Sequence, residues 1–260
     1  DRDEIRLTIN DAQSKFNGIC SYTVDLYSGD NEKLLTVASS TNTVTIPFDR
    51  DIVGYPERDD IASYKLKVTA IERNTNHSTE SDFISGVIST SIYGTWIPSI
   101  EEIDGSVTKD VISLLAVNNE DVYYGFSEYK IKISNGDDVL HVSTSKFAST
   151  QLQINRAKFG YPEKDDFDNY VIEVTPVDTI SKKAGKTFTY NGSALNRDKY
   201  GTWIPSFPTI NTTINRRNAT LEISQPTNPL ELFGVIRNKI EIKRQSEEGW
   251  FTPNLESDPQ

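Results

Sequence analysis

A seven-residue sequence, Tyr-Gly-Thr-Trp-Ile-Pro-Ser, occurs twice without change in this chain, at residues 93–99 and again at residues 200–206. The two copies lie 107 residues apart, which is longer than the repeat unit of a solenoid and matches the size of a small domain. A second motif, Gly-Tyr-Pro-Glu, repeats in nearly the same register at residues 54–57 and 160–163. The sequence therefore predicts tandem copies of one domain.

The repeats divide the chain into three predicted domains. With the Trp of each heptapeptide as the boundary, we expect a first domain at residues 1–96 without its opening strand, a second at residues 97–203, and part of a third at residues 204–260. The chain contains no Met, so we expect it to be a segment of a longer protein.

Short segments in which apolar and polar residues alternate predict that each domain is built from β-strands. Residues 5–9 follow this period of two, and residues 112–116 are their counterpart. Residues 64–70 and 170–176 alternate in the same way. Helical spacing of apolar residues is not sustained over three turns anywhere, so we expect an all-β fold. In the alternating segments, the side chains expected to face the cores are Leu66, Val68, Ile172 and Val174.

A tyrosine opens the penultimate predicted strand of each domain, a few residues after the Gly-Tyr-Pro-Glu loop. These residues are Tyr64 and Tyr170. The placement is typical of a tyrosine corner, in which the hydroxyl bonds back to the backbone upstream. We expect both side chains to be buried, with their hydroxyls bonded to the backbone near the loop.

Three features together resemble fibronectin type III domains: the order of strands, the Tyr-x-Leu/Ile-x-Val pattern at residues 64–68 and 170–174, and a repeat of about a hundred residues. The resemblance spans nearly the whole chain and implies tandem immunoglobulin-like β-sandwiches. The chain departs from the family at one position, because Leu7, Leu114 and Leu221 stand on the second strand, where the family usually carries a Trp.

Closing a domain with Tyr-Gly-Thr-Trp-Ile-Pro is similar to the tandem fibronectin-like modules in tail-tip and host-specificity proteins of tailed bacteriophages and prophages. This resemblance implies a virion tail component that works outside the cell, next to other tail or surface proteins. Its modules would be spacers or would contact a host envelope receptor or glycan. Two other contexts fit the same modules: the ectodomain of a cell-surface receptor or adhesin, and the accessory modules of a secreted carbohydrate-active enzyme.

The repeated tryptophans and prolines mark the predicted interdomain junction. We expect Trp96 and Trp203 to pack one module against the next, and the alternative, a platform on which a ligand stacks, stays open. Pro98 and Pro205 fix the backbone angle φ, remove a hydrogen-bond donor and favour an extended entry into the next domain. The sequence therefore predicts a short and stiff linker.

Composition restricts the partners and the chemistry. A net charge of −11 argues against nucleic acid as the partner, and no apolar run approaches the length needed for membrane insertion. The single cysteine excludes an intrachain disulfide. The two histidines, His77 and His141, occupy non-equivalent positions outside any nucleophile or metal-ligand motif. We therefore predict no catalytic residues, no metal site and no cofactor.

The acidic loops at residues 57–60 and 163–166 offer carboxylate oxygens, the ligands that Ca²⁺ prefers. Their spacing is not that of an EF-hand, and a bend before the tyrosine accounts for their Gly, Tyr and Pro without a metal. Two other loops, residues 72–82 and 178–186, share almost no residues although their flanks agree. We place any binding specificity in these two variable loops, with neutral drift in exposed turns as the alternative.

Overall fold

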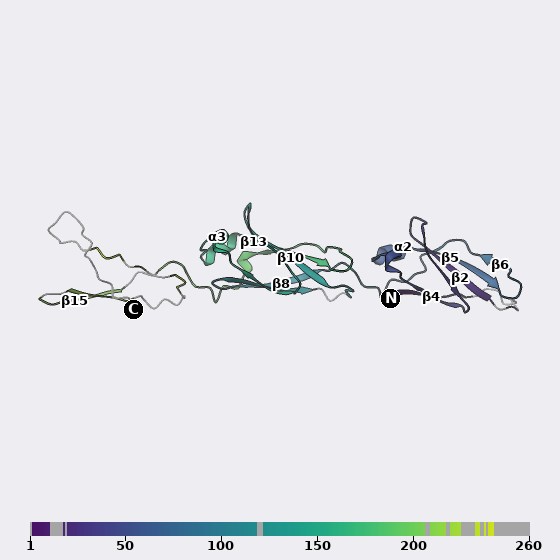
Figure 1. Ribbon diagram of the computed structural model, residues 1–260, viewed down its shortest axis with the longest axis horizontal. Helices are drawn as coiled ribbons and strands as arrows, with labels where there is room; N and C mark the ends of the chain where they lie inside the picture. Colours follow the sequence, from purple (N-terminus) through teal and green to yellow (C-terminus); the bar gives the residue numbers. More distant parts are fainter. Residues whose placement is uncertain are drawn as a thin grey trace.

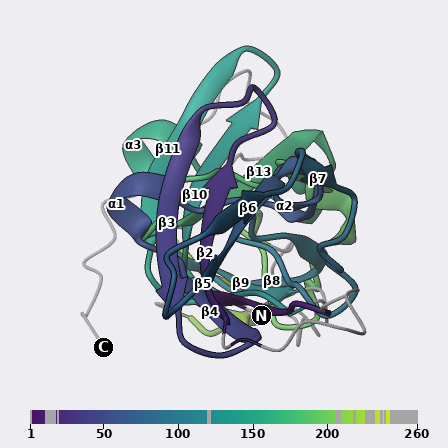
Figure 2. The same ribbon diagram turned by 90° about the vertical axis from the view of Figure 1, so that its right-hand side faces the viewer.

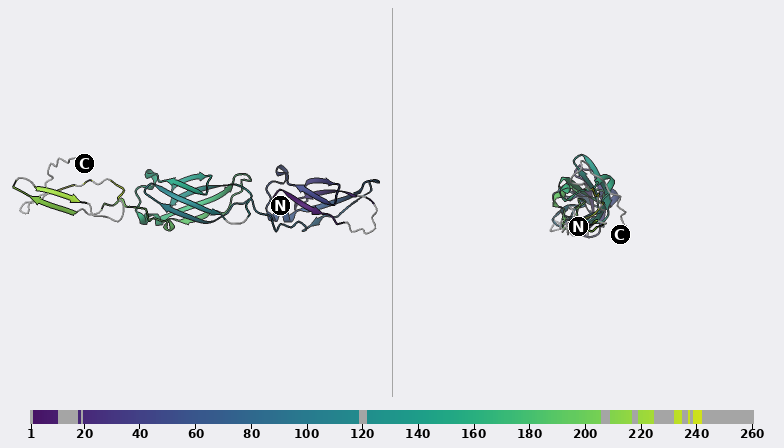
Figure 3. Two further views of the ribbon diagram at one scale, coloured as in Figure 1. Left: turned by 90° about the horizontal axis from the view of Figure 1, so that it is seen from below. Right: turned by 90° about the vertical axis from the view of Figure 1, so that its left-hand side faces the viewer.

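The strands form three groups that follow one another along a single axis (Figure 1). We call them the first, second and third modules. Seen along that axis the modules overlap (Figure 2), and the left view of Figure 3 shows the same straight string from below. This computed structural model describes residues 2–10, 18, 20–118, 122–205, 209–216, 219–224, 232–234, 237 and 239–241.

The second module is a β-sandwich with seven strands in its described residues. One antiparallel sheet has the order β12-β9-β8 and the other the order β11-β10-β13-β14. Isoleucines from both sheets fill the space between them, and Ile112, Ile133 and Ile172 have no exposed surface. The predicted all-β sandwich is confirmed. The strands are β8 (Ile100–Val107), β9 (Val111–Asn118), β10 (Ser127–Asn135), β11 (Asp138–Ser145), β12 (Ser149–Gln153), β13 (Tyr170–Asp178) and β14 (Phe188–Asn191).

The first module repeats this plan without a counterpart of β8 among its described residues. Its larger sheet has the order β3-β2-β5-β6, with β7 also paired to β5, and its smaller sheet contains β1 and β4. Val24, Leu26 and Ile46 form the centre of its core, with at most 1% of their surface exposed. The strands are β1 (Glu4–Thr8), β2 (Cys20–Tyr27), β3 (Lys33–Ser39), β4 (Thr43–Pro47), β5 (Lys65–Glu72), β6 (Ser78–Glu80) and β7 (Ile84–Ser85).

The predicted register of the penultimate strands is confirmed. Leu66 is buried on β5, and Val68 is partly buried and packs against the same core. Ile172 and Val174 are buried on β13. Between the two core residues of β5, Lys67 points to the other face and its ammonium group lies 2.8 Å from a carboxylate oxygen of Glu80.

Short helices interrupt the strands, which the sequence did not predict. They are α1 (Arg50–Val53), α2 (Arg58–Ser63), α3 (Arg156–Phe159), η1 (Lys164–Asn169) and η2 (Gly192–Ala194), the last two being 3₁₀ helices. None exceeds two turns, so none repeats an apolar face often enough to give a helical period. Local caps stabilise them instead: the Asp60 carboxylate accepts the Glu57 backbone N–H at 2.8 Å, and Asp166 accepts that of Glu163 at 2.7 Å.

The third module is described only in part. Its antiparallel hairpin consists of β15 (Thr209–Ile214) and β16 (Ala219–Ser224). Leu221 lies on β16, as its place on the second strand of a fibronectin-like module predicts. Most of the predicted third domain, residues 204–260, lies outside the described residues.

Candidate functional site

The two repeated motifs bind each other within each module. The hydroxyl of Tyr93, the first residue of the heptapeptide, donates to the carbonyl oxygen of Pro56 at 2.9 Å. In the second module Tyr200 makes the same bond to Pro162 at 2.5 Å. Each Trp then donates its indole N–H to this tyrosine oxygen, at 3.2 Å for Trp96 and 3.4 Å in the second copy.

The glutamate of the Gly-Tyr-Pro-Glu motif completes this pairing. One carboxylate oxygen of Glu57 accepts the Thr95 hydroxyl at 2.8 Å, and the other accepts the Trp96 backbone N–H at 3.2 Å. Glu163 accepts from Thr202 and Trp203 in the same way, at 2.8 and 2.7 Å. The acidic loops therefore have a structural partner in the chain itself.

An arginine that the sequence analysis did not single out lies over each tryptophan. The guanidinium carbon of Arg50 is 4.8 Å from the ring centroid of Trp96, and that of Arg156 is 4.7 Å from the ring of Trp203. Helices α1 and α3 place these arginines at their first residue, after the N-caps Asp49 and Asn155. Each arginine stands six residues before the proline of its Gly-Tyr-Pro-Glu motif. This shared position was the signal by which the sequence could have identified the pair.

The next module contributes one backbone segment and one aromatic ring to the junction. The backbone N–H of Thr95 donates to Val122 at 2.9 Å, and that of Tyr124 donates to Thr95 at 3.0 Å. The Tyr124 ring lies 5.5 Å from Trp96, between centroids, and its hydroxyl accepts the Gly94 N–H at 2.7 Å. A Cβ on Gly94 would lie 2.0 Å from the Val122 carbonyl oxygen, so this close approach requires glycine.

The second junction repeats this arrangement with the third module. Phe233 takes the place of Tyr124: its N–H donates to Thr202 at 2.9 Å and its ring centroid lies 5.3 Å from that of Trp203. Trp96 is 1% exposed and Trp203 is half-buried. The structure therefore places both predicted tryptophans at contacts between consecutive modules.

The two prolines differ in their surroundings. Pro98 is buried, and its carbonyl oxygen lies so close to Gly185 that an added Cβ there would be 1.8 Å away. Pro205 is exposed. Pro98 therefore packs against the variable loop of the second module, while the corresponding proline follows Trp203 at the surface.

The variable loop of the second module lies on the first module. The Lys183 ammonium group donates to the Tyr55 carbonyl at 2.6 Å and to Glu57 at 2.9 Å, while the Ser181 hydroxyl reaches the Trp96 carbonyl at 3.5 Å. Residues 178–186, one of the two loops in which we placed any binding specificity, therefore contact the first module.

The variable loop of the first module has the same backbone turn. Glu72 N–H bonds to the His77 carbonyl at 2.9 Å, as Asp178 bonds to Lys183 at 2.8 Å. Thr79 pairs with β5 where the second module carries Gly185. The first module thus has a histidine in place of the lysine that contacts the preceding module, and a threonine in place of the glycine that lies against Pro98.

Asp178 anchors the second module's side of the junction. It is fully buried and accepts the Tyr123 hydroxyl, the Phe126 N–H at 2.9 Å and the Ile180 N–H at 3.0 Å. Burial alone would raise the pKa of this carboxyl group, but the hydrogen bonds outweigh it and hold the pKa below its ordinary value. Burial and Asp178 both raise the pKa of the Tyr123 hydroxyl.

Tyr64 and Tyr170 do not hold the role that we assigned to them. Both are buried, and burial raises the pKa of each hydroxyl to about 12. In the described residues, however, neither hydroxyl donates to the Gly-Tyr-Pro-Glu loop, and Tyr93 and Tyr200 make that bond. The reason is position: the heptapeptide passes directly over the loop, and its tyrosine reaches the proline carbonyl.

No group of three or more His, Cys, Asp or Glu side chains in the described part of the chain could hold a metal ion. Across those same residues, no helix has the length and apolar character to cross a membrane. The site that the described residues do present is the repeated junction.

Strand order and junction together define the class of fold: tandem fibronectin type III-like β-sandwiches. No known family profile matches the chain, and no curated protein matches it. Among solved structures, it is similar to a segment of two fibronectin type III domains from chicken tenascin, with 12% identity and a TM-score of 0.30 over 73% of this chain and 91% of that chain.

Two further solved structures are similar at the same level. The chicken interferon gamma receptor alpha chain has 10% identity and a TM-score of 0.25, with 68% of this chain and 86% of that chain covered. The FN1–FN3 domains of chicken CNTN1 have 14% identity and a TM-score of 0.25, with 72% and 62% covered. The fold assignment rests on the strand order of the chain itself.

Proposed function

We propose that this chain is a non-catalytic string of modules that acts as a stiff spacer in an elongated extracellular or virion structure. The observation that carries the proposal is the recurrence of one set of contacts at both junctions: tyrosine to proline, glutamate to threonine, arginine over tryptophan, and an aromatic ring from the next module. A stiff spacer needs each junction to hold a fixed orientation, and the same contacts at both junctions support this.

The apolar and backbone contacts supply most of the orienting free energy. Burial of a large aromatic side chain contributes roughly 1.5–3 kcal/mol, and Trp96 is almost wholly buried. The ion pair of Lys183 with Glu57 is partly exposed, with 31% and 23% of the side chains accessible. Such a pair contributes about 1 kcal/mol or less. Its role is to select one orientation among those that the aromatic contact permits.

A more specific proposal concerns the structure in which this spacer is located. The likeness of Tyr-Gly-Thr-Trp-Ile-Pro to the module ends of phage and prophage tail-tip proteins supports a place in a virion tail, beside other tail proteins and near a host envelope receptor or glycan. Antibodies against the purified chain test this by immunogold labelling. Gold at the tips of tails supports the proposal, and gold confined to the cell envelope favours the ectodomain of a receptor or adhesin.

The spacer role itself is tested at Tyr124, which the second module places against Trp96. Tyr124→Ala should broaden the distribution of maximum dimensions in small-angle X-ray scattering while both modules stay folded. The control is Phe126→Ala, because Phe126 lies two residues away and is 71% exposed. Unchanged scattering for Tyr124→Ala, with its folding intact, would contradict a junction that fixes orientation.

A further inference from the structure

The hairpin of β10 and β11 projects away from the body of the second module (Figure 2). Its turn consists of Gly136 and Asp137, and Asn135 stands opposite Asp138 where the two strands meet the turn. All four of these residues are exposed. The tip of the hairpin therefore presents an Asn-Gly dipeptide to solvent.

An Asn-Gly dipeptide offers little steric resistance to one internal reaction. The backbone nitrogen of the second residue attacks the side-chain amide carbon of the asparagine, and glycine has no Cβ to shield that nitrogen. Beyond its chain neighbours, no atom lies within 4 Å of the place where a Cβ on Gly136 would stand. Within the part of the chain that the structure describes, the Asn135 side chain and the Gly136 N–H make no hydrogen bond. Both reacting groups are therefore unhindered.

A second Asn-Gly dipeptide in the same module is held by its surroundings. Asn191 ends β14 opposite Val171, and Gly192 begins helix η2. A Cβ on Gly192 would lie 2.1 Å from the Phe167 carbonyl oxygen, and the Gly192 carbonyl accepts the Leu195 N–H at 3.1 Å. The Gly192 nitrogen therefore cannot turn toward the Asn191 side chain unless this end of β14 opens.

We propose that Asn135 is a site of spontaneous modification, at which the asparagine converts to aspartate and isoaspartate in the folded chain while Asn191 stays intact. The Gly136 nitrogen bonds to the side-chain amide carbon of Asn135, and the side-chain nitrogen leaves as ammonia with the proton from the Gly136 N–H. One water molecule then opens the resulting cyclic imide. Cleavage at the side-chain carbonyl leaves aspartate, and cleavage at the main-chain carbonyl leaves isoaspartate.

The two dipeptides differ in the free energy needed to bring the nitrogen to the amide carbon. The attack requires the backbone to rotate out of its native conformation. At an exposed hairpin tip this local opening costs little, whereas residues that are paired and packed open only together with the segments that hold them. We expect Asn135 to convert roughly ten times faster than Asn191, or more.

The conversion changes both the charge and the backbone at the tip. A carboxylate at position 135 would stand directly opposite the carboxylate of Asp138, and like charges in such a pair destabilise the pairing of two strands. Isoaspartate also adds one carbon to the main chain, which disturbs the register beside the turn. Among the described residues β11 pairs only with β10, so the start of this edge strand should loosen.

The test incubates the full 260-residue chain at neutral pH in heavy-oxygen water and follows both dipeptides by peptide mapping with mass spectrometry. We expect aspartate and isoaspartate that carry the heavy oxygen at position 135, and an unmodified Asn191. The matched sample is the same chain unfolded in guanidinium chloride, where the two dipeptides should convert at similar rates because the fold no longer distinguishes them. Equal conversion of both in the folded chain, or an Asn135 that stays intact while the unfolded sample converts, would overturn the proposal.

Hydrogen exchange tests the effect on the hairpin. The backbone amide of Asp138 should exchange faster in the aged chain than in the fresh chain, whereas Asn135→Gln, whose longer side chain closes a ring less readily, should show the same exchange at both ages. Asn135→Asp supplies the charge without the added main-chain carbon and separates the two effects. Equal exchange at Asp138 in fresh and fully converted chains would overturn the loosening of β11.

Discussion

Few residues connect the two repeated motifs, and each of them makes more than one hydrogen bond. The Tyr93 hydroxyl donates to Pro56 and accepts the indole N–H of Trp96. Glu57 accepts from the heptapeptide and also receives Lys183 from the next module. This explains why two motifs about 40 residues apart repeat together: each is the hydrogen-bonding partner of the other.

Tyr93→Phe should therefore lower the free energy of unfolding of the first module by roughly 1–3 kcal/mol, because it leaves the buried Pro56 carbonyl and the Trp96 indole without their partner. The measurement is urea unfolding followed by NMR signals of that module. Tyr64→Phe is the control and should change the free energy by less than about 0.5 kcal/mol, because no hydrogen bond to the loop is lost. An equal decrease in the free energy of unfolding for the two variants would mean that the Tyr64 hydroxyl also makes a stabilising hydrogen bond, as a tyrosine corner requires.

Acid should weaken the second module through Asp178, whose folded pKa lies below its ordinary value even though burial acts to raise it. A depressed pKa contributes stability above the unfolded pKa, near pH 3.9, and this contribution is lost as pH falls through the folded pKa. The urea midpoint of Asp178→Asn should therefore lie below that of the unmodified chain at neutral pH, and the gap should narrow below about pH 4. If the difference between the two urea midpoints does not change between neutral pH and pH 4 or below, the protonation of Asp178 does not contribute to the acid sensitivity of the module.

At the scale of the elements, period-two alternation was sufficient to predict β1, β5, β9 and β13 and to identify which side chains of β5 and β13 face the core. The short helices were not predicted, because α1 and α3 have only four residues each and depend on local caps. The junction residues Trp96 and Trp203 were found because their motif repeats. Their arginine partners were missed because they stand in a stretch where few neighbouring residues agree.

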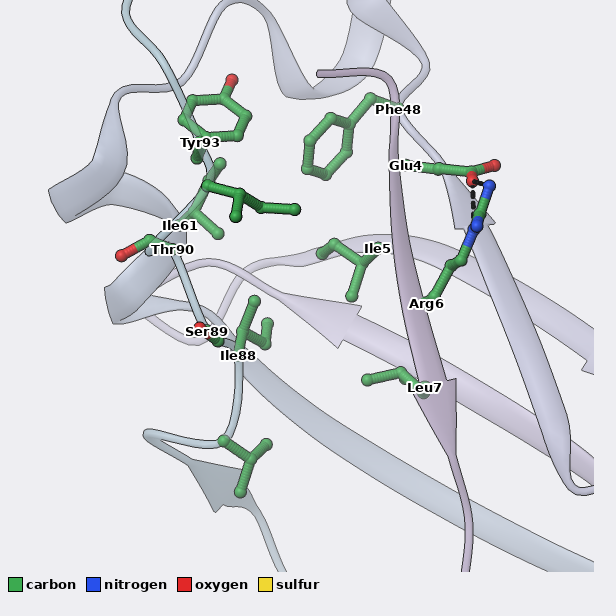
Figure 4. Close-up of a pocket in the computed structure, with 12 residues that line it drawn as sticks. Glu4, Ile5, Arg6, Leu7, Phe48, Ile61, Ile88, Ser89, Thr90 and Tyr93 are labelled. Atoms are coloured by element: carbon green, nitrogen blue, oxygen red, sulfur yellow. Dashed lines mark hydrogen bonds and ion pairs between the residues drawn. The ribbon is translucent and has the colours of Figure 1, made fainter. Parts of the chain in front are cut away.

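The equivalent strands β1 and β9 should respond differently to the same substitution, because β9 pairs with β8 on one edge, whereas β4 is the only strand paired with β1 among the described residues. Figure 4 shows Arg6 on β1. Ser113→Pro removes an N–H that pairs with β8, so it should destabilise the second module by roughly 1–3 kcal/mol. Arg6→Pro at the matching position of β1 should leave the first module within about 0.5 kcal/mol. Thermal unfolding of each variant gives the comparison, and a loss at Arg6 as large as at Ser113 would mean that the β1 edge is already paired.

At the scale of the whole molecule, the contacts across the first junction come from two separate parts of the second module: the segment around Tyr124, and the loop that carries Ser181 and Lys183. Contacts at several points resist both bending and twisting, whereas one hinge would resist neither. Residues 178–186, one of the two variable loops in which the sequence analysis places any binding specificity, make some of these contacts. Sequence alone could not reveal this, because it does not show which module end faces another module.

Residual dipolar couplings of backbone N–H groups, measured for the first and second modules of the 260-residue chain in one alignment medium, test the stiff junction most directly. If the junction holds the modules in one orientation, the couplings of both modules fit a single alignment tensor with the same magnitude and axes. Tensors that differ in magnitude between the modules would mean that they reorient independently, and would contradict the spacer account.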